Sequence, residues 1–188
     1  MYKCIIDTET TGLDHTTHGL HQVAAIVLDE NDKEAGRIDL KFKPTKLVYS
    51  NQALEKTRLT AEELYDRKLT SQDAFSQFIE FLDEFVNCYD KKDKMQFMAY
   101  NTAFDEAFIR TWFEQSENVY FNSYFWAPTV CLKKTAAWHL RTIRPQFERF
   151  KLRTVCQFAQ IDFNEDEAHD AMYDVERTVE LYHKLAGV

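Results

Sequence analysis

The sequence predicts an α/β domain in which helices cover the faces of a mixed sheet. Three strand-like segments follow one another through short connections, and after about residue 43 helical periodicity dominates, with further strand-like segments between the helices. Strands joined by short connections pair antiparallel, whereas strands separated by helices can pair in parallel. The chain has 188 residues, of which 45% are apolar and 29% charged, so we expect one domain spanning residues 1–188.

The first three strands differ in their patterns. Residues 2–6 form a nearly continuous apolar run that ends at Asp7, which is typical of a central strand buried on both faces. Residues 20–28 carry apolar side chains on both parities and are predicted to be interior as well. Residues 37–43 alternate strictly, so this strand should have one wet face. We expect the three to form an antiparallel meander.

The remaining segments are mostly helical. Thr60 with Glu63, and Thr70 with Asp73, have the spacing of capping boxes and predict two helix starts. The apolar stripe over residues 75–86 predicts an amphipathic helix. The other expected elements are a strand at 95–99, a helix at 102–113, a short strand at 125–129, and helices at 130–140, 152–159 and 168–186.

The charge is acidic overall, with 23 Lys and Arg against 31 Asp and Glu and a net charge of −8. This balance argues against a protein that coats nucleic acid through a broad positive surface. Residues 131–153 are the exception, because they contain seven basic residues and one acidic residue. That stretch is either a local phosphate-facing surface or an ordinary solvated helix face with a basic loop.

The four cysteines have no metal-binding spacing, and no secretory leader or membrane-length apolar run is present. We therefore expect reduced thiols in a soluble, cytoplasmic protein without a membrane partner. The histidines at 15, 18 and 21 are predicted to be polar loop residues, because no thiolates accompany them. The aromatic residues between 113 and 126 are predicted to pack in the core or in loops, although aromatic faces can also stack on bases.

The strongest local signal follows the first strand. Asp7 and Glu9 are two residues apart, so in a strand they share a face about 6.6 Å apart and form half of a site for a hard cation. Thr10, Thr11 and Gly12 then offer hydroxyl and backbone N–H groups to a phosphate or a sugar. Acidic residues at a strand end also commonly serve only as turn acceptors, so this segment alone leaves both interpretations open.

Two further segments carry acids to the same region. Asp105 lies in the first turn of the helix that follows the fourth strand, where the strand ends of an α/β sheet collect ligands. His169 and Asp174 lie near the start of the last helix, about 140° apart if both were helical, so His169 should lie on the entering loop. From there the imidazole could reach a water molecule as a general base.

Four carboxylates gathered in one place require cations, because like charges raise one another's pKa. Two divalent ions balance four negative charges, and a two-ion site suits hydrolysis of a phosphodiester. Carboxylate ligands without thiolates favour Mg²⁺ or Mn²⁺ over Zn²⁺. The sequence therefore predicts a nuclease with two Mg²⁺ or Mn²⁺ ions.

The three segments resemble the motifs of the DEDDh, or DnaQ-like, 3'-5' exonucleases, a family that includes the proofreading subunit of bacterial DNA polymerase III and ribonuclease T. Residues 7–12 (Asp-Thr-Glu-Thr-Thr-Gly) resemble the first motif, Asn101-x-x-Phe104-Asp105 the second, and His169-x(4)-Asp174 the third. The resemblance covers nearly the whole chain. It implies a ribonuclease H-like mixed five-stranded sheet with strand order 3-2-1-4-5, flanked by helices.

The resemblance also implies residue roles. Asp7, Glu9 and Asp174 would bind the first metal, Asp7 would bridge to the second, Asp105 would help to hold the second through water, and His169 would be the general base. The implied substrate contacts are Thr8, Thr10, Thr11, Gly12, Leu13, Asn101 and Phe104. The implied reaction removes nucleoside 5'-monophosphates from the 3' end of single-stranded nucleic acid, with DNA favoured.

The chain departs from the family pattern in one segment that bears on the substrate. Many relatives carry Glu-Ala and then His-Gly after the third strand, where this chain has Gln52-Ala53 and Thr57-Arg58, so sugar contacts from this segment stay open. An exoribonuclease acting on RNA ends is the alternative enzyme, and a noncatalytic nucleic-acid-binding module the alternative from another class. A DNA polymerase is a further partner that the resemblance allows, although no attachment tail follows the last predicted helix.

Overall fold

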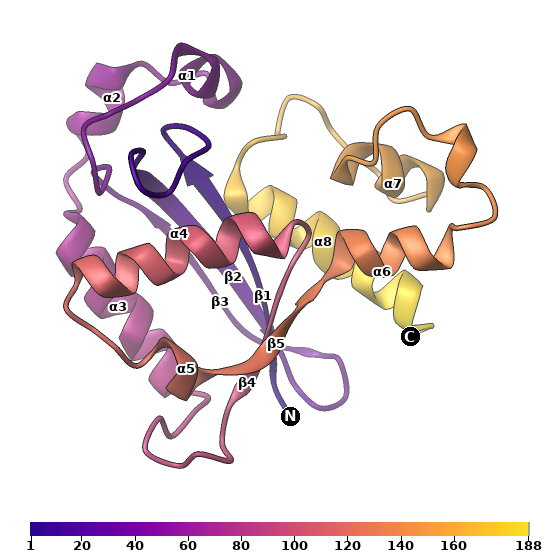
Figure 1. The fold of residues 1–188 in the computed structure, drawn as a ribbon, viewed down its shortest axis with the longest axis horizontal. Helices are drawn as coiled ribbons and strands as arrows, with labels where there is room; N and C mark the ends of the chain where they lie inside the picture. The colour runs from indigo at the N-terminus through magenta and orange to yellow at the C-terminus, as the bar shows by residue number, and fades with distance from the viewer. Residues whose placement is uncertain (188) are drawn as a thin grey trace.

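The computed structural model describes residues 1–187 and shows one five-stranded mixed sheet with the order β3-β2-β1-β4-β5, as predicted (Figure 1). Strands β1 and β2, and β2 and β3, pair antiparallel, whereas β4 pairs in parallel with both β1 and β5. The bounds are β1 Lys3–Thr10, β2 Leu20–Leu28, β3 Glu34–Lys41, β4 Met95–Ala99 and β5 Phe125–Cys131. The parallel pair of β1 and β4 brings their carboxyl ends to the same edge.

Eight helices accompany the sheet within the described residues. They are α1 Asn51–Thr57, α2 Ala61–Tyr65, α3 Ser71–Asp83, α4 Thr102–Gln115, α5 Phe121–Tyr124, α6 Leu132–His139, α7 Leu152–Phe158 and α8 Ala171–Ala186, with a 3-10 turn at Arg144–Gln146. Thr60 and Thr70 cap α2 and α3 as predicted, because their side chains accept from the backbone N–H groups of Glu63 and Asp73. Helix α1 was not predicted, since none of its residues is buried and it lacks an apolar stripe.

Helices cover both faces of the sheet (Figure 1). On one face, α3 and α4 pack against Cys4 and Ile6 of β1 in the largest apolar cluster. On the other, α8 packs against Ile5 of β1 and Ile26 of β2 in a second cluster. Strand β1 is therefore buried on both sides, as its continuous apolar run predicts.

A third cluster lies beyond the sheet edge and joins α6, α7 and the end of α8. Ala136, Val155, Cys156 and Leu181 are its helical members, with Tyr100 after β4 completing the contact. This cluster fixes the basic stretch 131–153 next to the end of β4. Within residues 1–187, no helix has both the length and the apolar character needed to cross a bilayer.

Some boundaries and assignments differ from the sequence predictions. Strand β1 continues past Asp7 to Thr10, because its pairing with β2 continues as far as the partners Thr10 and Leu20. Helix α8 begins at Ala171 rather than at 168, since Asp170 caps it. His21 is not a loop residue but a buried member of β2. The aromatic prediction is confirmed for the buried residues Phe113, Phe121, Tyr124 and Phe125.

Trp112 anchors α4 to the core, and α4 carries Asp105. Its ring stacks on Phe42 with centroids 4.9 Å apart, and its indole N–H donates to Ser71 Oγ at 2.9 Å. We expect Trp112→Ala to lower the free energy of unfolding by about 3–5 kcal/mol, measured by urea denaturation. The matched control is Trp138→Ala, which removes a ring that is 68% exposed and should cost less than about 1 kcal/mol. Equal losses for the two variants would contradict this role of Trp112.

Candidate active site

The carboxyl ends of β1 and β4 border a cavity of about 210 Å³. All five predicted catalytic side chains line it: Asp7, Glu9, Asp105, His169 and Asp174. The other lining residues are Thr8, Thr10, Leu13, Ser50, Gln52, Ala53, Lys56, Thr57, Tyr100, Asn101, Phe104 and Leu152. Three segments far apart in the sequence thus meet at one edge of the sheet.

The alternation of β1 separates its polar residues onto two faces. Asp7 and Glu9 share the parity of Ile5, which packs toward α8, where Asp174 lies in the first turn. Thr8 shares the parity of Cys4 and Ile6, which pack toward α4. The strand therefore directs its two carboxylates at α8 and its hydroxyl at α4.

Asp105 lies in the first turn of α4 and is buried. Thr8 Oγ1 donates to Asp105 Oδ1 at 2.9 Å, a buried hydrogen bond between residues 97 positions apart. The sequence predicted a substrate contact for Thr8; the residue does line the cavity, and its hydroxyl donates to Asp105. Thr8 therefore orients a carboxylate of the cavity.

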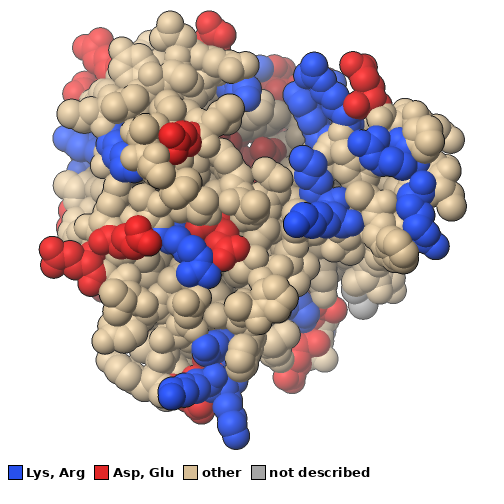
Figure 2. Space-filling view, in the orientation of Figure 1, with Lys and Arg blue, Asp and Glu red and all other residues tan. Residues whose placement is uncertain are grey.

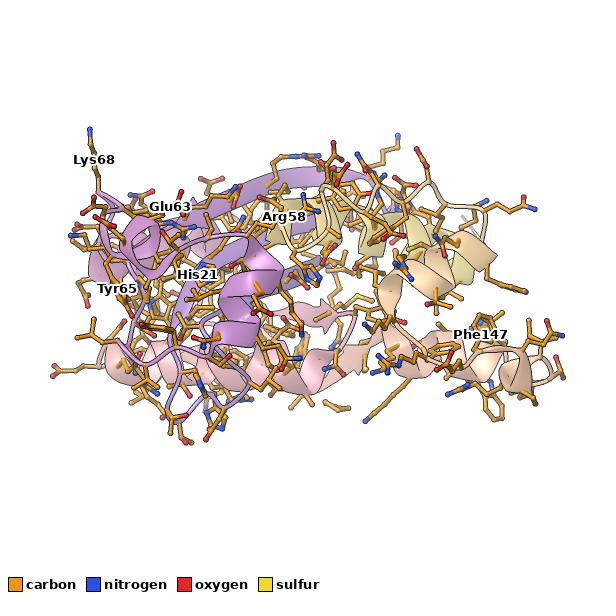
Figure 3. The ribbon with its side chains drawn as sticks, turned by 90° about the horizontal axis from the view of Figure 1, so that it is seen from above. His21, Arg58, Glu63, Tyr65, Lys68 and Phe147 are labelled. Atoms are coloured by element: carbon orange, nitrogen blue, oxygen red, sulfur yellow. The ribbon has the colours of Figure 1, made fainter. Side chains whose placement is uncertain are left out.

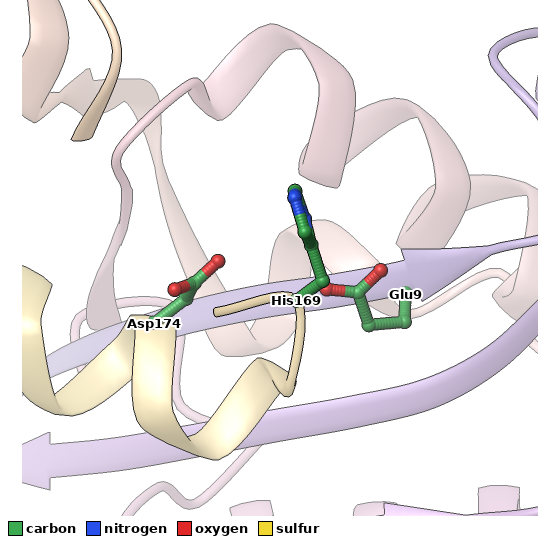
Figure 4. A group of neighbouring side chains, drawn as sticks. All are labelled: Glu9, His169 and Asp174. Atoms are coloured by element: carbon green, nitrogen blue, oxygen red, sulfur yellow. The ribbon is translucent and has the colours of Figure 1, made fainter. Parts of the chain in front are cut away.

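His169 and Asp174 approach Glu9 from the start of α8. His169 has a φ of 69° and lies outside the helix, as predicted from the spacing. One atom each of Glu9, His169 and Asp174 lies within 4.8 Å of the others, and the three side chains converge from β1, the entering loop and α8 (Figure 4). Asp7 and Asp105 line the same cavity but do not belong to this closest group.

Asp170 fixes the position of this loop. Its side chain accepts from the backbone N–H groups of Met172 and Tyr173, which makes it the N-cap of α8. Its other oxygen accepts from Lys41 Nζ at 2.6 Å and from Gln22 Nε2 at 3.5 Å. The loop bearing His169 is therefore tied to β2 and β3. The sequence signal was an Asp directly before a helix, but its strand partners could not be found without the fold.

The acidic cavity raises the pKa of each carboxyl group in it. Burial is the largest cause for Asp7, whose pKa is raised further by the charges of Asp105, Asp174 and Glu9. Burial and the charge of Asp174 likewise raise the pKa of Glu9. For Asp105 and Asp174, burial raises the pKa to about 7. Without cations these side chains resist ionisation at neutral pH.

The donor set fits divalent cations. Asp174 Oδ1 is buried and has no hydrogen-bond partner among the described residues. Four carboxylate groups face the same cavity, and no thiolate lines it. An unpartnered buried carboxylate oxygen among others is a ligand position for a hard cation such as Mg²⁺ or Mn²⁺.

His169 is kept neutral in this setting. Burial lowers its pKa, and the charges of Lys56, Lys151 and Arg58 lower it further. A neutral imidazole at physiological pH is able to accept a proton. Lys56 also lowers the pKa of Glu9, so this lysine lies close enough to act on both groups.

The loop after β1 places only part of the first motif in the cavity. Thr10 and Leu13 line it, and the Leu13 side chain is 73% exposed. Thr11 does not line it, because Thr11 Oγ1 donates to the Val48 carbonyl and Thr11 N–H to the Gly19 carbonyl. Gly12 also stays outside, and a Cβ there would clash with the His18 ring. Thr11 and Gly12 thus lie outside the cavity lining and shape the loop that carries Thr10 and Leu13.

The second motif and helix α1 complete the lining. Asn101 and Phe104 both line the cavity, and Phe104 packs on Phe108 with ring centroids 4.9 Å apart. Gln52 and Lys56 lie four residues apart on α1, so they share a face and both reach the cavity. The sequence prediction missed Lys56, because α1 itself was not recognised.

Solved structures that are similar to this fold include two exonucleases. Escherichia coli exonuclease I in complex with a dT13 oligonucleotide superposes with a TM-score of 0.75 at 22% identity, covering 100% of this chain and 41% of that one. A full-length 3'-exonuclease gives a TM-score of 0.75 at 16% identity, covering 99% and 81%. The chain thus spans less than half the length of exonuclease I. These similarities show that the chain has a ribonuclease H-like fold.

Comparison of the sequence with known proteins identifies the family of this chain. The chain belongs to the exonuclease family, whose profile matches residues 4–182, and it is a DEDDh-type 3'-5' exonuclease. Ribonuclease T of Shewanella denitrificans is 26% identical over 193 residues, which cover 96% of this chain and 78% of that protein. Ribonuclease T of Vibrio cholerae is 27% identical, covering 96% and 80%. Divalent metal ions are the normal cofactors of this family.

Divalent ions should stabilise the protein more at high pH. Because the folded-state pKa values of Asp105 and Asp174 are raised to about 7, the metal-free protein loses stability as the pH rises through that value. Added Mg²⁺ must displace protons at about pH 5.5 but binds ionised groups at about pH 8.5. We expect the melting temperature in Mg²⁺ to exceed the melting temperature in EDTA by more at about pH 8.5 than at about pH 5.5, as measured by differential scanning fluorimetry.

The variant Asp7→Asn tests whether this effect comes from the cavity. It removes one cavity charge and should reduce the Mg²⁺-dependent rise in melting temperature at both pH values. Asp73→Asn, at the exposed start of α3, should leave the rise unchanged. A Mg²⁺ effect of equal size at the two pH values would contradict the raised carboxyl pKa values.

Proposed function

We propose that this protein removes nucleoside 5'-monophosphates one at a time from the 3' end of single-stranded DNA, using two Mg²⁺ or Mn²⁺ ions. The observation that carries the proposal is the convergence of Asp7, Glu9, Asp105, Asp174 and His169 on one cavity. Four acids and one imidazole at a strand-end cavity are the groups that hydrolysis of a phosphodiester requires.

The carboxylates would hold the metal ions. Asp7, Glu9 and Asp174 face the cavity from β1 and α8, and Asp105 faces it from α4, where Thr8 fixes one of its oxygens. When bound, the ions supply charge neutralisation at the phosphate and lower the pKa of the attacking water. The protein contributes the rigid placement of these ligands on a central strand and two helices.

His169 would accept the proton of the attacking water. Its lowered pKa keeps the ring neutral, and its loop position leaves the imidazole partly exposed while Asp170 holds the backbone. The water oxygen then forms a bond to phosphorus as the bond to the 3' oxygen of the preceding nucleotide breaks. That oxygen takes a proton from solvent, so the products are a 5'-monophosphate and a chain one nucleotide shorter.

The terminal nucleotide would occupy the space between α1 and the start of α4. Leu13 and Phe104 offer apolar surfaces on which a base can lie, and Gln52 and Asn101 offer amide groups to polar edges. Gln52 stands where many relatives carry the acid of Glu-Ala, and the amide can still accept a hydrogen bond from a sugar hydroxyl.

DNA is the preferred substrate in this proposal because several solved structures with this fold are of exonuclease I bound to single-stranded DNA. RNA is the second candidate, since ribonuclease T sequences are similar to this chain over 96% of its length. The amide and hydroxyl groups that line the cavity are neutral, so they do not exclude a substrate that carries a 2'-hydroxyl. The choice between the two polymers therefore needs a direct comparison.

Matched DNA and RNA oligonucleotides, each labelled at the 5' end and separately at the 3' end, test this function with Mg²⁺ present. We expect a labelled mononucleotide as the first product of the 3'-labelled strand and a descending ladder from the 5'-labelled strand, faster for DNA. Asp7→Asn should reduce the rate at least about a hundredfold while keeping the melting temperature in EDTA. Unchanged cleavage by this variant would overturn the assignment, and faster RNA cleavage would overturn the DNA preference.

Replacement of His169, the proposed general base, gives a second test of the function. We expect His169→Ala to lower kcat by about 10²–10⁴-fold, because the water loses its proton acceptor. The Mg²⁺-dependent rise in melting temperature should be largely kept, since the four carboxylates remain. His139→Ala, an exposed histidine on α6, is the control and should match the wild type. A kcat within a few-fold of the wild type would exclude His169 as the base.

A further inference from the structure

A second groove of about 400 Å³ opens beside the catalytic cavity, and the proposed function does not use it. It lies between α1 and α7 and shares four residues with the catalytic cavity: Lys56, Leu152, His169 and Asp174. The groove and the catalytic cavity are therefore adjacent, with these four residues at the boundary between them.

Four cationic side chains line the groove: Lys56 and Arg58 on the α1 side, and Lys151 and Arg153 on the α7 side. Three acids accompany them, Glu55, Glu165 and Asp174, and Asp174 is one of the carboxylates of the catalytic cavity. The groove is thus positive in a chain whose net charge is −8. A local excess of cations in an acidic protein attracts polyanions to that place and repels them elsewhere.

The cations are available to a ligand. Among residues 1–187, Lys56 and Lys151 have no carboxylate within 4.0 Å. Arg58 pairs with Asp166 at 3.2 Å and Arg153 with Glu165 at 2.8 Å, and the side chains of these ion pairs are 48–85% exposed. Exposed pairs contribute little stability, so phosphates can replace the carboxylates at small cost.

The views of the molecule agree with this arrangement. Figure 2 shows Lys and Arg side chains gathered over the α6 and α7 side of a hollow, with acidic side chains inside the hollow. Figure 3 shows Arg58 beside α1, toward the segment that leads into α8. The sequence left open whether the basic stretch 131–153 faces phosphates, and its residues Lys151 and Arg153 do border the groove.

We propose that this groove binds the backbone phosphates of the nucleotides that precede the terminal one, and so holds the upstream part of a single-stranded substrate. The inference rests on the proposed function, because it requires the 3' end to occupy the catalytic cavity. Leu152 and Phe163 add apolar surface between the cations. A groove with alternating cationic and apolar positions suits a flexible single strand better than a rigid duplex.

The groove sets how affinity depends on substrate length. A substrate too short to leave the cavity makes no groove contact, whereas a longer strand places successive phosphates beside the four cations. Each phosphate contact releases bound counterions and adds about 0.7 to the slope of log affinity against log salt for a single strand. Longer substrates should therefore bind more tightly and with a steeper salt dependence.

The test compares the double variant Lys151→Gln/Arg153→Gln with wild type on oligothymidylates of increasing length. The p-nitrophenyl ester of thymidine 5'-monophosphate is the reference, since it occupies only the catalytic cavity. Assays at about pH 8 keep His169 deprotonated even when the charge of Lys151 is removed. Lys91→Gln/Lys92→Gln, in the exposed turn before β4, removes the same charge elsewhere and is the matched control.

We expect KM for long oligothymidylates to rise at least about tenfold in the groove variant, with kcat kept and the salt slope reduced by about 1.4. Ester hydrolysis should match wild type, which also shows that the variant is folded. The control variant should match wild type on every substrate. If wild type cleaves but the groove variant keeps its length dependence and salt slope, the groove inference fails alone. If wild type cleaves neither ester nor oligonucleotide, the proposed function fails.

Discussion

The repulsion among four carboxylates in one cavity is the constraint on which the rest of the molecule depends. Burial and mutual charge raise the pKa of Asp7 and Glu9, and burial raises that of Asp105 and Asp174, so the cavity is costly until cations enter it. A loose scaffold would relieve this cost by moving the acids apart. The fold prevents that movement, because the acids stand on β1, α4 and α8, each held by apolar packing.

The apolar clusters on the two faces of the sheet hold different residues of the site in place. The aromatic-rich cluster under α3 and α4 fixes Asp105, and Thr8 joins it to the central strand. The smaller cluster under α8 fixes Asp174 and, through the cap at Asp170, the loop of His169. Lys41 extends that support to β3. Ligands and base are therefore held from opposite sides of one strand, which limits independent movement of either group.

Much of this could be predicted from the sequence, and the omissions have physical reasons. The strand order and the three motifs were recognisable, and the angle between His169 and Asp174 around a helix correctly placed His169 on a loop. Helix α1 was missed because nothing in it is buried, so it has no periodic apolar signal. The partners of Thr8 and Asp170 were missed because they join residues brought together only by folding. Thr11 was misplaced because a turn hydroxyl can face inward as easily as outward.

The alternation along β1 has a consequence for how this chain can change during evolution. Cys4 and Ile6 belong to one layer, and Ile5, Asp7 and Glu9 to the other, so insertion or deletion of one residue in the strand would exchange the layers. The acids would then enter the aromatic core while isoleucine faced the cavity. Length variation among descendants of this protein should therefore accumulate in the hairpins and in the turn before β4, and the eight residues of β1 should keep their number.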